Sequence, residues 1–341
     1  MTTIKDVARV ANVSIATVSA TFNNSAVVRE ETRQRVHAAA VQVGYTPNSI
    51  ARSLRLARTN LIGVVVQSIS NPYCAAVVRR IEKAAADAGY SIIICNAEDE
   101  ARSMEVLAQL RRQRVDGIIM MPSSSSARFV DLLGKPDLPP LVTVDQKLPD
   151  LERDFIGIDN RAAARMLADY LLRLGHRRIA CITGEAGLWT AEERLAGAKQ
   201  AIEDAGLEVD PSLFVRSTFH LRSGNAVAAD LLNRVDRPTA IIAGNNVLAL
   251  GTLRAAIDLG FRCPEDISIV GIDDVPWGDL VKPRITTVVQ PVKEIGNLAI
   301  AWLLERLSDE SAATQPREQI FMPRFVAGES CADIRQVEQS D

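Results

Sequence analysis

Histidine, cysteine and the common catalytic motifs are scarce in this sequence. Its 341 residues include three histidines and five cysteines, and no two cysteines form a CxxC pair. The odd number, and the apolar runs around residues such as Cys95, indicate reduced, buried thiols rather than a disulfide framework or a metal site. The sequence also contains no GxSxG, Walker A, HExxH or glycine-rich dinucleotide-binding turn. These absences disfavour an enzyme, and we expect neither a cofactor nor a metal.

Long apolar segments are missing as well. The first residues, Met1 to Asp6, contain no apolar core of signal-peptide length. No run elsewhere approaches the ~18 apolar residues that a membrane span requires. We therefore expect a cytoplasmic protein that has no membrane partner.

The charged residues are distributed unevenly along the chain. The net charge of -3 argues, taken alone, against a nucleic-acid partner. Residues 1–60, however, contain eight lysines and arginines and three acidic residues, so they carry +5 and leave -8 on the remainder. A basic head on an acidic body is typical of a polyanion-binding module attached to a second domain.

The first 44 residues predict three short helices. Thr3 can cap a first helix, whose apolar residues Ile4, Val7, Ala8 and Ala11 share one face. Asn12 and Val13 break this helix, and Ser14 can cap a second one with an apolar stripe at Val18 and Phe22. The turn between them has about three or four residues, which is helix-turn-helix spacing. A third helix is expected between Glu30 and Gly44.

Several motifs occur in this region in one order and at one spacing. They are Thr3-Ile4-Lys5-Asp6-Val7-Ala8, the Val-Ser-x-x-Thr-Val-Ser run from Val13, Gly44-Tyr45-x-Pro47-Asn48, and Ala51-Arg52-Ser53-Leu54. These motifs resemble the lac repressor/GalR (LacI) family of bacterial transcription regulators, and the similarity continues to about Ser330. The resemblance implies a helix-turn-helix DNA-binding domain at 1–46, a hinge helix and linker at 47–60, and an effector-binding and dimerisation domain at 61–341.

The resemblance also implies which residues contact DNA. In the family the hinge lies in the minor groove, where a leucine at the position of Leu54 wedges between base pairs. A hinge helix of about eight residues is marginal alone, so we expect it to order on DNA. Packing under the third helix is the alternative for Leu54. The predicted DNA contacts are Ser14, Ile15, Ala16, Thr17, Ser19, Ala20, Asn23, Ala51, Leu54 and Arg55.

Three of these positions depart from the family. Ile15, Ala16 and Ala20 are apolar where polar residues often read base edges. They can touch thymine methyl groups but cannot form the bidentate bonds that discriminate bases by ~1–3 kcal/mol each. We therefore expect specificity to depend on the hinge, on thymine methyl contacts and on DNA deformability.

From Leu61 onward, predicted strands and helices alternate. Strands are expected at 61–66, 90–95, 115–121, 141–145, 155–159, 179–183, 240–243 and 267–272. Helices are expected at 75–88, 102–114, from Asn160, and at 191–205, 247–259 and 295–307. Such a series predicts parallel, doubly wound sheets. The two series resemble the type I periplasmic-binding-protein fold, with an N-lobe at about 61–158 and 291–322 and a C-lobe at about 159–290 and 323–341.

Ligands of doubly wound sheets bind outside the carboxyl ends of the strands, so the effector site is expected between the lobes. Carboxylates accept hydrogen bonds from hydroxyls, arginine offers a planar fork to hydroxyls or a carboxylate, and aromatic rings cover the C–H face of a sugar. By resemblance, the predicted effector contacts are Tyr73, Asp145, Arg194, Phe219, Asn245, Asp273 and Gln290. A strand-end cap or an interlobe salt bridge is the alternative for each. Trp189 is expected in the cleft or in surface packing, and Trp277 in the core or a dimer interface.

Cys74 stands where the family frequently has an aromatic residue, so one stacking wall is lost. A sugar or sugar acid is therefore expected rather than a purine, which needs two aromatic faces. The tail after Ser330 lacks the leucine heptads of a tetramerising coiled coil, and a homodimer is expected.

Together these features predict a DNA-binding transcriptional regulator, in particular a repressor. It would bind a palindromic double-stranded operator as a dimer and respond to a small sugar or sugar acid. Induction and corepression are both compatible with the sequence. One alternative is a solute-binding protein of transport, which the basic head and absent signal peptide disfavour.

The other alternative is an α/β enzyme, for which the missing motifs and the three histidines give no support. His37 falls on a predicted helix of the head. His176 follows Gly175 at a helix end, where a positive partner of the helix dipole is the expected role. His220 is the third.

Overall fold

The computed structural model describes residues 2–22, 28–45, 58–275, 278, 280, 282–308 and 315–336. The chain forms two compact units, Met1–Thr59 and Asn60–Asp341. Most of the predicted hinge lies outside the described residues. The individual predicted residues outside them are Asn23, Ala51, Leu54, Arg55 and Trp277.

The described part of the first unit contains three helices: α1 (Ile4–Ala11), α2 (Ile15–Phe22) and α3 (Glu30–Val43). The Asp6 carboxylate accepts hydrogen bonds from the Thr3 backbone N–H at 3.0 Å and from its hydroxyl at 2.8 Å, which fixes the start of α1. Asn12 ends this helix in the left-handed region at φ 51°, and Gly44 ends α3 in the same way at φ 65°. The three predicted helices are thus confirmed.

A small core holds these helices together. It contains Val7, Ala8, Ala11 and Val18, which the sequence predicts to face inward, together with Val36, Ala39 and Ala40 of α3. Ile4, Phe22 and Val43 pack against it from its edge, where each keeps part of its surface exposed. Because α1 and α2 both contribute to this core, their relative angle is set by packing rather than by the turn alone.

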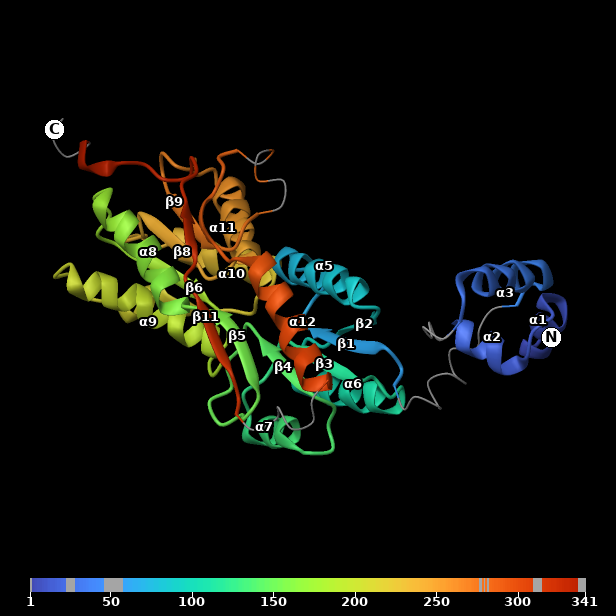
Figure 1. The fold of residues 1–341 in the computed structure, drawn as a ribbon. Coiled ribbons are helices and arrows are strands. Elements are labelled where there is room, and N and C mark those ends of the chain that lie inside the picture. The colour runs from blue at the N-terminus through green and yellow to red at the C-terminus, as the bar shows by residue number, and fades with distance from the viewer. Residues whose placement is uncertain are drawn as a thin grey trace. The chain divides into compact units, whose positions relative to one another are not determined.

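The second unit contains two six-stranded sheets (Figure 1). The first sheet is parallel and has the order β11 (Glu318–Phe321), β5 (Asp154–Ile158), β4 (Leu141–Val144), β3 (Gly117–Met120), β1 (Leu61–Val66), β2 (Ser91–Asn96). The second has the order β12 (Arg324–Val326), β10 (Thr286–Val289), β9 (Ser268–Ile272), β8 (Ala240–Ala243), β6 (Ile179–Thr183), β7 (Phe214–Arg216). Of the described strands, only β12, at one edge of the second sheet, runs antiparallel to its neighbour.

Helices cover both faces of each sheet. In the first lobe, α5 (Pro72–Asp87) and α12 (Val292–Ser308) pack together on one face, and α6 (Glu100–Arg112) and α7 (Ala127–Gly134) cover the other (Figure 1). In the second lobe, α8 (Asn160–Arg173) pairs with α9 (Trp189–Asp204), and α10 (Leu221–Leu232) pairs with α11 (Asn246–Asp258). Val64 and Val66 point to the α5 side, whereas Val65 points to the α6 side. Double coverage explains why the central strands are continuous apolar runs.

The chain passes between the two sheets three times: from β5 to α8, from β10 to α12, and from β11 to β12. Each lobe is therefore built from segments that are distant in the sequence, as predicted for a two-lobed body. Among the described helices, none combines the length and apolar character that a membrane crossing requires.

Candidate functional site

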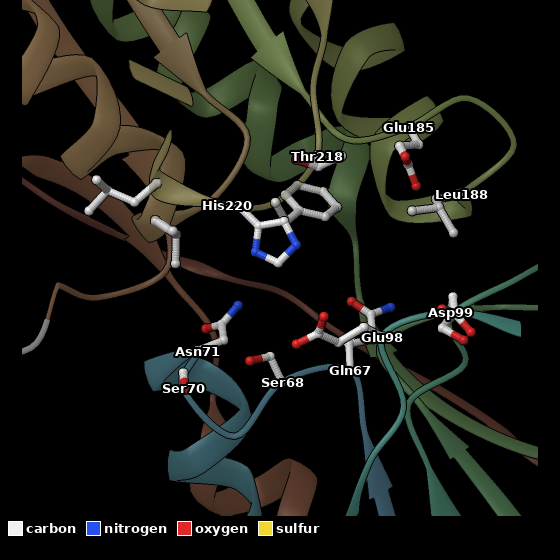
Figure 2. A pocket seen from close by; sticks show the side chains of 14 residues that line it. Gln67, Ser68, Ser70, Asn71, Glu98, Asp99, Glu185, Leu188, Thr218 and His220 are labelled. Atoms are coloured by element: carbon white, nitrogen blue, oxygen red, sulfur yellow. The ribbon is translucent and has the colours of Figure 1, made fainter. Parts of the chain in front are cut away.

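A cavity of about 300 Å3 opens between the two lobes. The first lobe contributes residues that follow β1, β2 and β3: Gln67, Ser68, Ser70, Asn71, Glu98, Asp99 and Ser123. The second lobe contributes residues that follow β6, β7 and β8: Glu185, Leu188, Thr218, Phe219, His220, Leu221 and Val247. The carboxyl ends of both sheets thus face one cavity, where doubly wound folds bind their ligands. Figure 2 shows His220 and Thr218 on one side of this cavity and Glu98, Ser68 and Asn71 on the other.

A charged cluster lies buried close to these strand ends. Arg194 is 4% exposed and donates two hydrogen bonds, from Nε to Asn160 Oδ1 at 2.7 Å and from Nη1 to the Gly244 carbonyl at 2.6 Å. Gln290 donates from Nε2 to Asp273 Oδ1 at 2.7 Å. Both members of the second pair are also buried. These contacts hold the guanidinium and the Asp273 carboxylate in fixed orientations.

Asp145 completes the cluster. Burial raises the pKa of its carboxyl to about 6, the Arg194 charge opposes that rise, and the Asp273 charge adds to it. Burial likewise raises the pKa of Asp273, again against the pull of Arg194. Two carboxyls therefore share one guanidinium. Ionising both of them costs free energy, because one positive charge cannot fully compensate two negative charges away from water. Perturbed titration of this kind in a cleft marks a candidate functional site.

Tyr73 borders the same cluster from the first turn of α5. Its hydroxyl is buried, and burial together with the Asp145 and Asp273 charges raises its pKa well above the usual range. Among the described residues, neither this hydroxyl nor Gln290 Oε1 has a partner within normal hydrogen-bond geometry. Buried polar atoms without partners cost free energy, so a ligand or water that reaches them is favoured.

Backbone conformation gives Asp145 and Asp273 a second common feature. Each follows the end of a strand and adopts a left-handed conformation, with φ 70° and φ 73° respectively. This region is unusual for a residue with a side chain, and aspartate and asparagine tolerate it best. Such conformations concentrate at functional sites, because the surrounding structure must hold them.

The structure brings five of the seven predicted effector residues together in the charged cluster and places a sixth in the cavity wall, but none of the five cluster residues is among those that line the 300 Å3 cavity. Tyr73, Asp145, Arg194, Asp273 and Gln290 form the cluster, and Phe219 lines the cavity. The Phe219 ring packs on Gly184, where an added Cβ would lie 2.4 Å from the ring. A side chain at position 184 would therefore displace the ring from its place beside the cavity.

Asn245 has a different role in the described structure. Its Oδ1 accepts a hydrogen bond from the Leu248 N–H at 2.8 Å, which caps α11. This is the structural alternative considered for each predicted contact. The cap uses the side-chain oxygen and leaves the Asn245 Nδ2 group for other partners. Val247, two residues further along the chain, lines the cavity.

Trp189 lies beside a second cavity of about 390 Å3 rather than among the lining residues of the first. Its ring packs edge-on against Phe155, with centroids 5.6 Å apart. Trp189 and Leu188 are neighbours in the sequence but line different cavities. Of the two roles expected for Trp189, a place in the cleft or packing near the surface, its contacts agree with packing and not with the lining of the 300 Å3 cavity.

Sequence reasoning missed Glu98, Asp99, Glu185 and His220, which also line the cavity. Asp99 could have been found, because it is a helix N-cap shortly after an apolar strand. Glu185 and His220 follow strands at positions where the sequence alone does not show which loop residues turn inward.

In the first unit, α2 presents an apolar surface at its start. Ser14 caps the helix: its Oγ accepts a hydrogen bond from the Thr17 N–H at 3.0 Å and lies 2.8 Å from the Thr17 hydroxyl. Ile15 is 45% exposed, Ala16 is exposed, and Thr17, Ser19 and Ala20 are half-buried. No residue of α2 is charged. The accessible start of α2 is suited to contact with base edges in a groove.

The described residues contain no group of three or more His, Cys, Asp and Glu side chains that could hold a metal ion. Their cysteines are not joined in disulfides. Burial raises the pKa of Cys74 and of Cys181 to about 12. These thiols are therefore protonated at neutral pH, which agrees with the structural role predicted for them.

The chain matches two family models. The first, for bacterial regulatory proteins of the lacI family, covers residues 3–48, and the second, for a periplasmic binding protein-like domain, covers residues 168–331. The chain is 38% identical over 299 residues to the HTH-type transcriptional regulator DegA of Bacillus subtilis, a match that spans 86% of this chain and 88% of DegA.

Two solved structures show the same architecture. The lac repressor dimer bound to operator and the anti-inducer ONPF superposes with a TM-score of 0.85 at 26% identity and covers 97% of this chain and 99% of that one. A LacI family regulator from Enterococcus faecium with bound ribose gives a TM-score of 0.72 at 29% identity and covers 81% of this chain and all of that one.

A helix-turn-helix unit joined to a two-lobed binding domain defines a class of DNA-binding regulators. This chain belongs to the lacI family of that class, as its N-terminal motifs predict, and is a transcriptional regulator rather than an enzyme.

Proposed function

We propose that this protein is a repressor that binds a palindromic operator as a homodimer. A small sugar or sugar acid in the interlobe cleft lowers or raises its affinity for the operator. The cluster of half-buried Asp145 with buried Arg194 and Asp273 is the observation that carries this proposal. It lies where the strand ends of both lobes meet, so one ligand can contact both lobes at once and change their closure.

The first unit supports the DNA-binding part of the proposal. α2 is the second helix of a helix-turn-helix, and its N-terminal residues are accessible. We assign base contacts to Ile15, Ala16 and Ala20, and backbone contacts to Ser14, Thr17, Ser19 and Asn23. We assign minor-groove contacts to the hinge residues Ala51, Leu54 and Arg55. The lac repressor dimer bound to operator provides the precedent for two such units on one duplex.

The cluster and cavity support the effector part. Asp145 and Asp273 accept hydrogen bonds from hydroxyls, Arg194 donates to them, and Phe219 covers a C–H face. Tyr73, Gln290 and the Nδ2 group of Asn245 add further polar contacts. The related regulator with bound ribose shows that a fold of this kind accommodates a small sugar.

Selection of preferred duplexes from a random DNA pool by the purified full-length protein tests the DNA-binding part. The expected result is a two-fold symmetric site, because two copies of the helix-turn-helix unit read two half-sites. Binding that is uniform across the pool and disappears as salt rises above about 200 mM would reflect phosphate attraction alone and would contradict a specific operator.

The variant Phe219→Ala tests the effector part on the same operator. It removes a cavity wall without touching the first unit. We expect effector affinity to fall by about tenfold, as for the loss of a packed aromatic contact, while operator affinity without effector stays unchanged. Equal loss of operator affinity would mean that Phe219 supports folding rather than the effector.

A further inference from the structure

The charges that face the cleft are almost all negative. Among the fourteen described residues that line the cavity, three are carboxylates, Glu98, Asp99 and Glu185, and none is lysine or arginine. His220 is the only lining residue that can become a cation, and Figure 2 shows it opposite Glu98. A ligand that enters the cleft therefore meets acidic side chains from both lobes.

Two of the three carboxylates have no compensating partner. Within the described part of the chain, Glu98 and Glu185 form neither an ion pair nor a hydrogen bond through their side chains. They come from opposite lobes, Glu98 after β2 and Glu185 after β6. Both side chains are exposed, so salt screens their charges, but each would repel an anionic ligand held between the lobes.

The one buried cation of the site, among the residues that the structure describes, is already committed. The Arg194 guanidinium donates from Nε to Asn160 and from Nη1 to the Gly244 carbonyl, and the Asp145 and Asp273 charges act on it from nearby. The bidentate fork that would grip a carboxylate or phosphate is thus partly occupied by protein atoms. Arg194 remains able to donate to a hydroxyl through its other N–H groups.

Helix N-termini near the cavity favour anions and must be weighed against this. α5, α6, α9, α10 and α11 begin beside it. The side chains of Asn71, Asp99 and Asn245 accept backbone N–H groups at three of these ends, whereas the N-cap residues of α9 and α10, Leu188 and His220, provide no side-chain cap. An α-helix end carries roughly half an elementary charge, less than one carboxylate. Five such ends amount to about +2.5 charges against the three carboxylates, so they reduce the negative balance of the cleft without reversing it.

We propose that the cleft selects its effector by charge: it admits neutral and amine-bearing sugars and rejects sugar acids and sugar phosphates. This inference rests on the proposed function, and it narrows the effector class expected from the sequence, in which Arg194 could equally have met a carboxylate. Buried, unpartnered polar atoms at Tyr73 and Gln290 in the described structure complement hydroxyls and do not require a charged ligand.

Calorimetric titration of the full-length protein with matched sugars tests the proposal. The probes are glucose, glucosamine and glucuronate, galactose, galactosamine and galacturonate, and ribose with ribose 5-phosphate. For the ring that binds, we expect the neutral or amine-bearing form to bind at least about tenfold more tightly than its acid or phosphate. The gap should narrow as salt rises, because screening weakens the repulsion.

A charge-neutral double variant, Glu98→Gln with Glu185→Gln, separates charge from shape. It should reduce the ratio of neutral-sugar affinity to acid affinity by several-fold, whatever its effect on the neutral sugar alone. The matched control is Glu203→Gln, which removes an exposed charge near the far end of α9, about 20 Å along the helix from Trp189. The control should change neither affinity.

An acid that binds as tightly as its neutral partner, or a double variant with unchanged preference, overturns charge selection and leaves the proposed function intact. If no member of the panel binds, the sugar effector of the proposed function is wrong, and charge selection among sugars falls with it.

Discussion

At the scale of single residues, titratable groups with little access to solvent should make the folding stability of this protein depend on pH. Asp145 and Asp273 share Arg194, and their pKa values are raised because burial outweighs that attraction. The charges of such a site lower the free energy of unfolding of the unliganded protein, and a bound ligand offsets that loss. Binding sites are often less stable than the rest of a protein for this reason.

Asp145→Asn should stabilise the unliganded protein in a pH-dependent way. The folded-state pKa of about 6 lies above the usual 3.8, so the stability associated with the protonated carboxyl is present below about pH 4 and lost as pH rises through about 6. We expect this substitution to raise the free energy of unfolding by about 1–3 kcal/mol at about pH 8, and by little at about pH 4. Asparagine also suits the left-handed backbone there.

Thermal unfolding across this pH range measures the effect. The exposed carboxyl of Asp230, replaced in Asp230→Asn, serves as the control. A gain in Tm that is the same at every pH would contradict the assignment of the effect to Asp145 ionisation.

His176 should make stability depend on pH in the opposite direction. Its Nδ1 lies 2.9 Å from the Thr239 hydroxyl, and burial lowers its pKa. The unfolded chain therefore binds a proton that the folded chain resists, so stability falls as pH drops through the usual imidazole pKa of about 6.5. This corrects the expectation that His176 acts as a positive partner of a helix end.

His176→Gln should flatten the decrease in Tm between about pH 8 and pH 5.5. If Tm falls equally steeply with pH in the variant and in the unmodified protein, His176 does not cause the decrease.

At the scale of elements, close helix packing shapes the second lobe. α10 and α11 approach each other at Gly251, where an added Cβ would lie 2.7 Å from the Leu221 carbonyl oxygen. The β7–α10 connection carries Phe219 and His220 into the cavity wall, so this contact also positions part of the site.

Gly251→Ala should therefore destabilise the second unit by about 1–3 kcal/mol, because backbone atoms must move to admit the methyl group. Gly134→Ala, on α7, is the matched control, since nothing lies within 4 Å of its added Cβ. Denaturant unfolding measures both variants. Equal stability of the two would show that α10 and α11 adjust without strain.

Much of this element structure was predictable from sequence. The long apolar runs of β1, β6 and β8 and the periodic helices α5, α11 and α12 were predicted to within a few residues, because their patterns are strong. α10 was not predicted, since Gly224 and Asn225 lower its helix propensity and only its packing on α11 explains it. α7 was also missed, because its serine-rich start resembles a loop.

The features of the candidate site likewise differ in whether the sequence alone could predict them. Tyr73, Asp145, Asp273 and Gln290 were predicted because they lie near strand ends and match family positions, and the structure places them in one cluster. The occupation of Arg194 by Asn160 and Gly244, and the inward position of Glu98 and Glu185, depend on tertiary packing. No sequence pattern records which N–H groups of an arginine are already used.

At the scale of the whole molecule, the chain combines a basic DNA-reading unit with an acidic body. Under the proposed function, the positive head would attract DNA phosphates and the negative body would repel them. Operator affinity should consequently fall steeply with salt, with a log–log slope of about -0.9 for each phosphate neutralised. A slope near zero, measured by fluorescence anisotropy, would mean that the first unit does not neutralise phosphates of the DNA backbone.

Linkage between the two ligands tests the central claim most directly. Operator affinity is measured with and without the sugar that the panel identifies, and sugar affinity with and without operator. The proposed function predicts that each ligand changes the affinity for the other by the same factor, about 5- to 150-fold. A sugar that binds the cleft and leaves operator affinity unchanged would contradict the account, because the cleft would then bind its ligand without regulating DNA binding.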